Sequence, residues 1–229
     1  MAVDEALLES AAAERVATLR FYEWSAPTLS LGYFQPAADR REHLASLACP
    51  LVRRASGGGA ILHDRELTYS LAIPTEHRLA GHAERLYLAT HEALAAALDA
   101  LGIQSHLLRN VAPRAAPLPF LCFERRAVGD LLIGQHKIAG SAQRRHRGAI
   151  LQHGSILLGT SPSAPELWGV AEITGNQIAA KSLANLLRAA LRDRLNLEWE
   201  QPSGGNRIAE RSRILAESKF TSADWTFRR

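Results

Sequence analysis

Apolar residues recur along this chain with two different spacings, and these divide it into expected helices and strands. Residues 4–19 carry alanine, leucine and valine at helical spacing behind two acidic residues, which predicts an amphipathic helix. A second helix is predicted over 83–101, because its leucines return every three or four residues and Gly102 stands in the usual C-cap place. Two more are expected, near 177–195 and, more polar, over 208–219.

Short apolar runs separated by glycine, proline or charge predict strands. The expected strands are 21–24, 28–33, 51–54, 60–62, 68–73, 131–133, 136–138, 149–151 and 155–158. The early runs have an antiparallel character, which argues against a doubly wound parallel sheet. The pattern therefore predicts one α/β (α+β) domain over residues 1–229, with a mixed, largely antiparallel sheet flanked by helices.

Composition places the chain among ordinary globular proteins. Its 229 residues are 47% hydrophobic and 22% charged, so a sizeable core is expected. No run reaches the roughly 18 apolar residues of a membrane span, and Met1 leads into acidic Asp4 and Glu5 rather than a basic segment. The two cysteines are too few for a disulfide framework. We expect a cytoplasmic protein with no membrane partner.

Net charge adds a hint about partners. The 27 basic residues exceed the 23 acidic ones, so an acidic partner is favoured. Residues 144–147 form a short basic cluster without interleaved aromatic residues, and aromatic residues are only 6% of the chain. We interpret this cluster as a solvated turn or a docking patch for an acidic protein, and we expect no nucleic-acid partner.

A glycine run between two expected strands is the first candidate for chemistry. Ser56 to Ala60 encloses three successive glycines, follows Arg53 and Arg54, and precedes His63. Such a backbone can approach a ligand closely and direct several N–H groups at one oxygen. The alternative is a flexible hairpin turn. A P-loop and a dinucleotide fingerprint are both excluded, because neither a Gly-Lys-Ser/Thr sequence nor a helix follows.

Two further segments carry candidate polar groups. Lys137 lies among small residues, where partial burial would lower its pKa or direct its ammonium at a carbonyl oxygen, although a solvated hairpin lysine is the simpler interpretation. His153, Gly154 and Ser155 do not have the spacing of a nucleophile elbow, so His153 is interpreted as a structural histidine.

The two cysteines differ in their surroundings. Cys122 follows a proline-rich segment at 113–119 and precedes Glu124-Arg125-Arg126, where positive charge would stabilise a thiolate; the alternative is an inert buried cysteine. Cys49 has no such neighbours and is interpreted as structural. The two cysteines also lack the paired spacing of a zinc site, and no metal is expected.

Taken in order, four motifs resemble the biotin/lipoate protein ligase catalytic domain, a class II aminoacyl-tRNA synthetase/biotin synthetase-like fold. They are residues 1–6, residues 27–32, the Arg-Arg-x-Ser-Gly-Gly-Gly-Ala segment ending in His63-Asp64, and residues 137–143. The resemblance runs to about residue 158. Other segments are closer to the cysteine-dependent octanoyltransferases of the LipM type: residues 63–70, Cys122-Phe123, residues 151–155 and residues 224–229.

The resemblance implies transfer of an octanoyl group from acyl carrier protein to a lysine of a lipoyl domain, in 2-oxoacid dehydrogenase or glycine cleavage proteins. It implies Cys122 as the nucleophile and Lys137 as the lysine at the reacting carbonyl, without metal or ATP. The residues it assigns to substrate binding are Arg54, Ser56, Gly57, Gly58, Gly59, Ala60, His63, Gly140, Ser141, Ala142, His153 and Gly154.

One difference from the octanoyltransferase motif leaves a second activity as an alternative. Those transferases usually carry arginine where this chain has Gly59, and a triple glycine is typical of lipoate-protein ligases, which use ATP and Mg²⁺ to form an acyl-adenylate. Against ligation, residues 159–229 look short for the ligase's accessory domain. We favour octanoyl transfer, with ATP-dependent lipoate ligation and a non-catalytic lipoyl-domain or acyl-binding relative as the alternatives.

Overall fold

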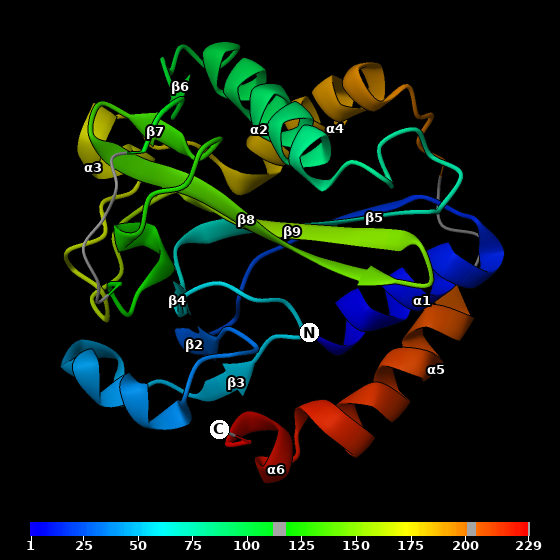
Figure 1. Cartoon of the computed structure of the whole chain (residues 1–229). Helices are drawn as coiled ribbons and strands as arrows, with labels where there is room; N and C mark the ends of the chain where they lie inside the picture. The colour runs from blue at the N-terminus through cyan, green and yellow to red at the C-terminus, as the bar shows by residue number, and fades with distance from the viewer. Residues whose placement is uncertain (112–117, 201–204, 229) are drawn as a thin grey trace.

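The computed structural model describes residues 1–111, 118–200 and 205–228, and two β-sheets form its centre (Figure 1). The six strands of the larger sheet are all antiparallel to their neighbours, in the order β1 (Thr18–Tyr22), β5 (Glu66–Ile73), β9 (Ala149–Leu157), β8 (His136–His146), β7 (Leu131–Ile133) and β6 (His106–Leu107). In the smaller sheet, β2 (Thr28–Leu31) pairs in parallel with β3 (Leu51–Arg53) and antiparallel with β4 (Ile61–His63). The predicted fold class is confirmed.

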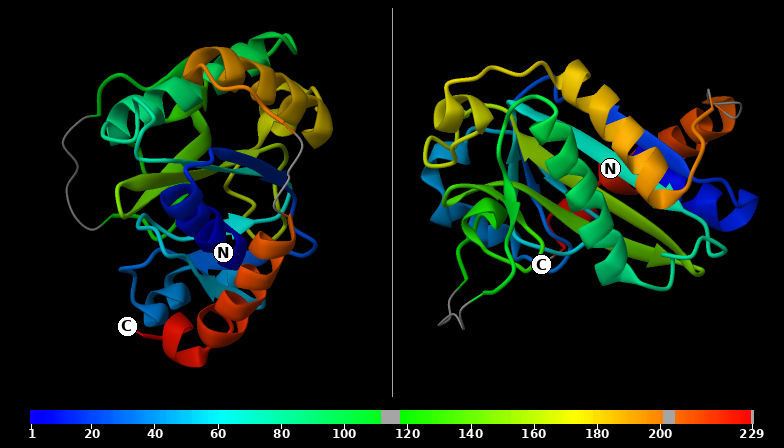
Figure 2. Two further views of the ribbon diagram at one scale, coloured as in Figure 1. Left: turned by 90° about the vertical axis from the view of Figure 1, so that its right-hand side faces the viewer. Right: turned by 90° about the horizontal axis from the view of Figure 1, so that it is seen from above.

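Helices pack on one face of the larger sheet. Helices α2 (Ala83–Asp99) and α4 (Ala180–Leu195) run side by side across it (Figure 2, right). Leu183, Leu187 and Leu191 recur every four residues on α4 and are all fully buried in the main core. Burying each leucine contributes about 1.5–3 kcal/mol, so this spacing fixes which face of the helix meets the sheet.

The opposite face of the larger sheet is shared by helices and the smaller sheet. Helix α1 (Ala2–Glu14) buries Leu7 and Leu8 against Ala72 and Leu151 of the sheet, and α5 (Gly205–Leu215) lies beside α1 (Figure 2, left). The smaller sheet occupies the rest of this face (Figure 1). The remaining short elements are 3₁₀ turns at Ala37–Glu42, Leu44–Ser46 and Cys122–Glu124, α3 (Val170–Thr174), a π-helical turn at Ala216–Phe220, and α6 (Ala223–Thr226).

Three sequence predictions are corrected by the structure. The first helix ends at Glu14, because Arg15 adopts a left-handed conformation with φ of 60°, and 18–22 form a strand. Strand β8 continues from residue 136 to 146, and the two strands expected at 149–151 and 155–158 are one. Residues 144–146 therefore end a strand, and only Arg147 of the basic cluster occupies a turn.

The structure also contains short elements that the sequence did not predict, because they are too short to show a periodic pattern of apolar residues. Strand β6 and helix α3 were not predicted, because they hold two and five residues. Most of the proline-rich segment at 113–119 lies outside the described residues, which resume at 118. Within the described ranges, no helix is long and apolar enough to span a membrane.

Candidate active site

A pocket lies between the two sheets, and residues from both of them line it. It contains most of the residues that the sequence assigned to a site: Arg54, Gly57, Gly58, His63, Cys122, Gly140, Ser141, Ala142, His153 and Gly154. Ser56, Gly59, Ala60 and Lys137 do not line this pocket, but each contacts a residue that does, as described below.

The floor of the pocket includes a row of side chains that crosses four adjacent strands. Tyr22 pairs with Thr68, Thr68 with Ser155, and Ser155 with Gly140. Directly opposed residues of antiparallel strands present their side chains on the same face, so this row faces the pocket together. Tyr22, Thr68 and Ser155 were not predicted as site residues. Thr68 and Ser155 lie within the segments 63–70 and 151–155 that carry the family resemblance, whereas only strand pairing brings Tyr22 into the row.

Arg54 holds the glycine loop, defined here as residues 56–59, in a fixed shape. Its Nη2 donates to the carbonyl oxygens of Gly57 and Gly59 at 3.2 and 2.8 Å. Gly58 has a φ of 96°, in the left-handed region that glycine adopts without strain. The loop joins β3 to β4, which do not pair with each other, so the hairpin interpretation is wrong.

The end of the glycine loop is joined to the cysteine segment by backbone hydrogen bonds. The N–H of Ala60 donates to Phe120 O at 3.0 Å, and the N–H of Cys122 donates to Ala60 O at 2.7 Å. A Cβ at Gly59 would lie 2.7 Å from the guanidinium carbon of Arg125. A side chain at position 59 would therefore displace the end of the Arg125 side chain.

Cys122 begins a 3₁₀ turn and is half-buried in the pocket wall, as a free thiol. Burial lowers the pKa of Arg54 to about 10, and the negative charge of an ionised Cys122 opposes that shift. The Arg54 guanidinium thus stays charged at neutral pH as an electrostatic neighbour of the thiol. Cys49, also free, is buried in the core of the smaller sheet, where a structural role was predicted.

Lys137 is buried, so the interpretation as a solvated hairpin lysine is wrong. Its Nζ forms an ion pair with Asp130 Oδ2 at 2.8 Å and donates to Cys122 O at 3.3 Å. A Cβ at Gly140 would lie 2.7 Å from Lys137 Cε, so glycine at 140 leaves room for the lysine. Asp130 in turn accepts a hydrogen bond from the Tyr87 hydroxyl at 2.7 Å.

Asp130 was not singled out in the sequence, and its replacement has a clear expected cost. In Asp130→Asn the amide still accepts from Tyr87, but the buried Lys137 ammonium loses its counter-charge. We expect the free energy of unfolding to fall by about 3–5 kcal/mol. Urea unfolding would measure this, and the double variant Asp130→Asn/Lys137→Met should recover most of the loss. An unchanged unfolding midpoint in the single variant would contradict the ion pair.

His63 belongs to a buried polar network in the pocket wall. Its Nδ1 lies 2.6 Å from Glu66 Oε1 and its Nε2 lies 2.7 Å from Ser30 Oγ, while Trp24 stacks on the ring at 4.2 Å. Arg54 Nη1 donates to the same Ser30 hydroxyl at 2.6 Å. Burial lowers the pKa of His63, and Glu66 opposes the shift. Both ring nitrogens are engaged, so His63 shapes the pocket wall.

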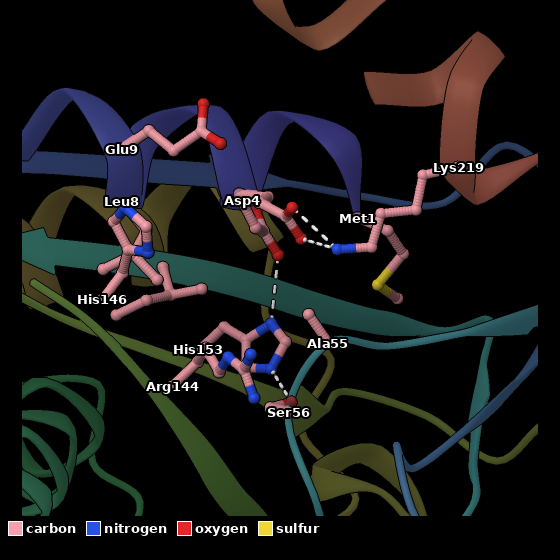
Figure 3. Close-up of a pocket in the computed structure, with 12 residues that line it drawn as sticks. Met1, Asp4, Leu8, Glu9, Ala55, Ser56, Arg144, His146, His153 and Lys219 are labelled. Carbon is pink, nitrogen blue, oxygen red and sulfur yellow. Dashed lines mark hydrogen bonds and ion pairs between the residues drawn. The ribbon is translucent and has the colours of Figure 1, made fainter. Parts of the chain in front are cut away.

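His153 connects helix α1 to the glycine loop. Its Nδ1 lies 3.0 Å from Asp4 Oδ2, and its Nε2 is hydrogen-bonded to the Ser56 hydroxyl, as Figure 3 shows. Burial alone would raise the pKa of Asp4, but the hydrogen bond with His153 and nearby positive charge hold that pKa well below its ordinary value. These contacts agree with a structural role for His153, which also lines the pocket, so its role in substrate binding stays a prediction. The three residues also line an adjoining pocket.

A second buried histidine lies beneath the site and makes stability depend on pH. His91 contacts Gly129 O through Nδ1 at 2.7 Å and Ser141 Oγ through Nε2 at 2.6 Å. Burial lowers its pKa from 6.5 to about 4. Because the unfolded chain binds the proton more tightly, the stability that neutral His91 contributes is complete above pH 6.5 and is lost as the pH falls toward 4.

From this single group we expect the free energy of unfolding to be about 2 kcal/mol lower at pH 5 than at pH 8. Urea unfolding at both pH values would measure the difference. In His91→Gln, whose amide can both donate and accept, that difference should shrink by a similar amount. A variant with the same pH dependence as the wild type would show that His91 is not responsible.

Comparison with known proteins agrees with this geometry. The family model described as the lipoyl protein ligase A/B catalytic domain matches residues 1–188. The chain is 41% identical over 172 residues to octanoyltransferase LipM of Kyrpidia tusciae, covering 72% of this chain but only 63% of that protein. It is 35% identical to octanoyltransferase LipM of Moorella thermoacetica, covering 100% of this chain and 93% of that one.

Among solved structures, lipoate-protein ligase A bound with ATP superposes with a TM-score of 0.79 over 99% of this chain and 92% of that one. At 22% identity this likeness shows a common fold. The family model covers most of the chain and several separated motifs fall together around one pocket. The chain therefore belongs to the lipoyl protein ligase A/B catalytic domain family.

Proposed function

We propose that this protein is an octanoyltransferase that moves an octanoyl group from acyl carrier protein to a lysine of a lipoyl domain, through a thioester on Cys122. The observation that carries the proposal is a half-buried free thiol in the wall of the pocket, with Arg54 and Lys137 as nearby cations. The names of the LipM relatives support it.

In the first step, the Cys122 thiolate attacks the carbonyl carbon of the donor thioester. Negative charge then develops on the carbonyl oxygen, where Lys137 and backbone N–H groups would stabilise it; one such donor contributes about 2.7–4 kcal/mol in a well-studied protease. The oxyanion collapses, the carrier's thiolate leaves, and the acyl group remains on Cys122.

The pocket floor offers a place for the acyl chain. Adjacent strands lie about 4.8 Å apart, so the three intervals from Gly140 to Tyr22 span about 14 Å across the sheet. That length exceeds that of an extended eight-carbon chain, so the row is long enough for the chain to lie along it. Gly140 lies against Lys137 at the reactive end, and Tyr22 is at the far end of the row.

In the second step, the neutral amine of the acceptor lysine attacks the Cys122 thioester. An amide forms, the amine loses one proton to solvent, and Cys122 leaves as the thiolate that began the cycle. Both half-reactions exchange one acyl bond for another, so the proposed route uses no metal or ATP. We expect it to operate in the cytoplasm, on lipoyl domains of 2-oxoacid dehydrogenase or glycine cleavage proteins.

The experiment is an incubation with octanoyl-acyl carrier protein, without ATP and with a chelator present. Intact-mass analysis should show one added octanoyl group on the protein, and adding a lipoyl domain should move that group to the acceptor over many turnovers. Acceptor modification that requires both lipoate and ATP would establish the ligase instead. Acyl binding without any turnover would establish a non-catalytic relative.

A further inference from the structure

The C-terminal part of the chain lies beyond the family model, which ends at residue 188, yet it contacts Arg53, which lies shortly before the glycine loop. Helix α5, the π-helical turn and α6 pass beneath α1 and reach β3 of the smaller sheet (Figure 1). We call residues 219–226 the C-terminal strap. Nothing in the proposed chemistry uses these residues, so their contacts need a separate explanation.

The strap holds the arginine that directly precedes Arg54. The Trp225 indole Nε1 donates to Arg53 O at 3.0 Å, and Arg53 Nε donates to Thr226 O at 3.0 Å. Arg53 is completely buried, at 0% exposure. Its backbone and side chain are thus both fixed by a segment more than 170 residues away along the chain.

Arg53 also contacts the backbone that supports the glycine loop. Its Nη1 donates to Gly32 O at 2.8 Å and to Gln35 O at 2.7 Å. Gly32 packs so closely on the loop that a Cβ there would overlap the carbonyl group of Gly58. The N–H of Tyr33 donates to Ser56 O at 2.8 Å. A shift of Arg53 therefore moves the backbone on which the glycine loop rests.

The strap also touches helix α1, on the other side of the loop. Lys219 Nζ forms an ion pair with Glu5, at 2.6 Å from Oε2, next to the Asp4 that binds His153 and so Ser56. Both groups of this pair are partly exposed, so it contributes little by itself. The buried contacts of Arg53 carry most of the constraint.

We propose that the C-terminal strap is a positioning element of the acyl site, and that Trp225 acts through Arg53 to hold the glycine loop in its pocket-forming shape. The proposal rests on the octanoyltransferase function for its kinetic consequence, but its structural consequence does not depend on any activity. Trp225 is a positioning residue, because it touches Arg53 and not the pocket.

The test replaces the indole donor and keeps the ring, in Trp225→Phe. The matched control is Trp199→Phe, because Trp199 Nε1 also donates to a backbone carbonyl, that of Arg188, at 3.0 Å. We expect KM for octanoyl-acyl carrier protein to rise about fivefold in Trp225→Phe, the loss typical of one hydrogen bond, with kcat nearly unchanged. Trp199→Phe should keep the wild-type KM.

A second readout needs no substrate. Hydrogen exchange at the amides of Tyr33 and Ala60, whose N–H groups donate to Ser56 O and Phe120 O at the two ends of the glycine loop, should become about fivefold faster in Trp225→Phe and stay unchanged in Trp199→Phe. Trp225→His, which keeps a ring N–H, should lie between the wild type and Trp225→Phe in both measurements; if phenylalanine prevents folding, this variant carries the test against the wild type.

The possible failures are distinguishable. Unchanged exchange at the Tyr33 and Ala60 amides, with only a lower melting temperature, would show that the strap stabilises the fold without positioning the loop. If the wild type never acquires an octanoyl group, the proposed function fails, and the exchange measurement still decides the role of the strap. Equal effects of the two Trp→Phe variants would overturn the inference.

Discussion

Replacing Cys122 by serine is expected to lower octanoyl transfer about a thousandfold or more, with no acyl adduct on the protein. Sulfur is an intrinsically strong nucleophile, whereas a serine hydroxyl needs an adjacent base to become one. Losses of at least this size follow removal of an enzyme's nucleophile. Initial rates of lipoyl-domain modification and intact-mass analysis would measure both effects.

Cys49→Ser is the matched control for this variant. Cys49 is the other cysteine of the chain and packs in the core of the smaller sheet with Ala37 and Leu51. Its serine variant should retain transfer activity and one acyl adduct, with a modest loss of stability from the buried hydroxyl. An adduct on Cys122→Ser, or wild-type transfer by it, would show that the acyl group is carried elsewhere.

The sequence predicted most accurately the helices whose apolar residues recur at helical spacing and form one buried face. The helices expected at 83–101 and 177–195 are α2 and α4, with ends within a few residues. Strand β8 was predicted too short because Gly140, Ser141 and Ala142 are small or polar, which is unusual for a strand covered by other elements. They lie under the pocket, where bulky side chains would fill the space the proposed acyl chain requires.

The residues of the candidate site were also predicted only in part. The glycine loop and His63 belong to local motifs, and the structure places both in one pocket wall. Asp130 carries no local signal, because its ion pair with Lys137 depends on the turn between β7 and β8. Tyr22 and Thr68 lie side by side in the pocket because β1 pairs with β5 in one particular register. No local pattern in a single sequence gives the register of two distant strands.

The second large effect is expected from Lys137→Met, which should lower kcat for acyl transfer about a hundredfold to a thousandfold. Lys137 Nζ donates to the backbone oxygen of Cys122 at 3.3 Å, and in the proposed mechanism its positive charge stabilises the substrate's oxyanion. Removing it should then cost about as much as losing one oxyanion donor. Lys137→Arg should not restore the rate, because the planar guanidinium needs more room than Gly140 leaves beside the lysine stem.

The measurement must separate lost catalysis from lost folding, because Lys137→Met leaves the buried Asp130 carboxylate unpaired. The double variant Lys137→Met/Asp130→Asn removes both charges, so we expect it to be folded by circular dichroism and still slow in transfer. Lys181→Met is the control, since Lys181 is exposed on α4 and its loss should leave the rate unchanged. A folded double variant with wild-type kcat would leave Arg54 as the cation serving Cys122 and reduce Lys137 to the structural partner of Asp130.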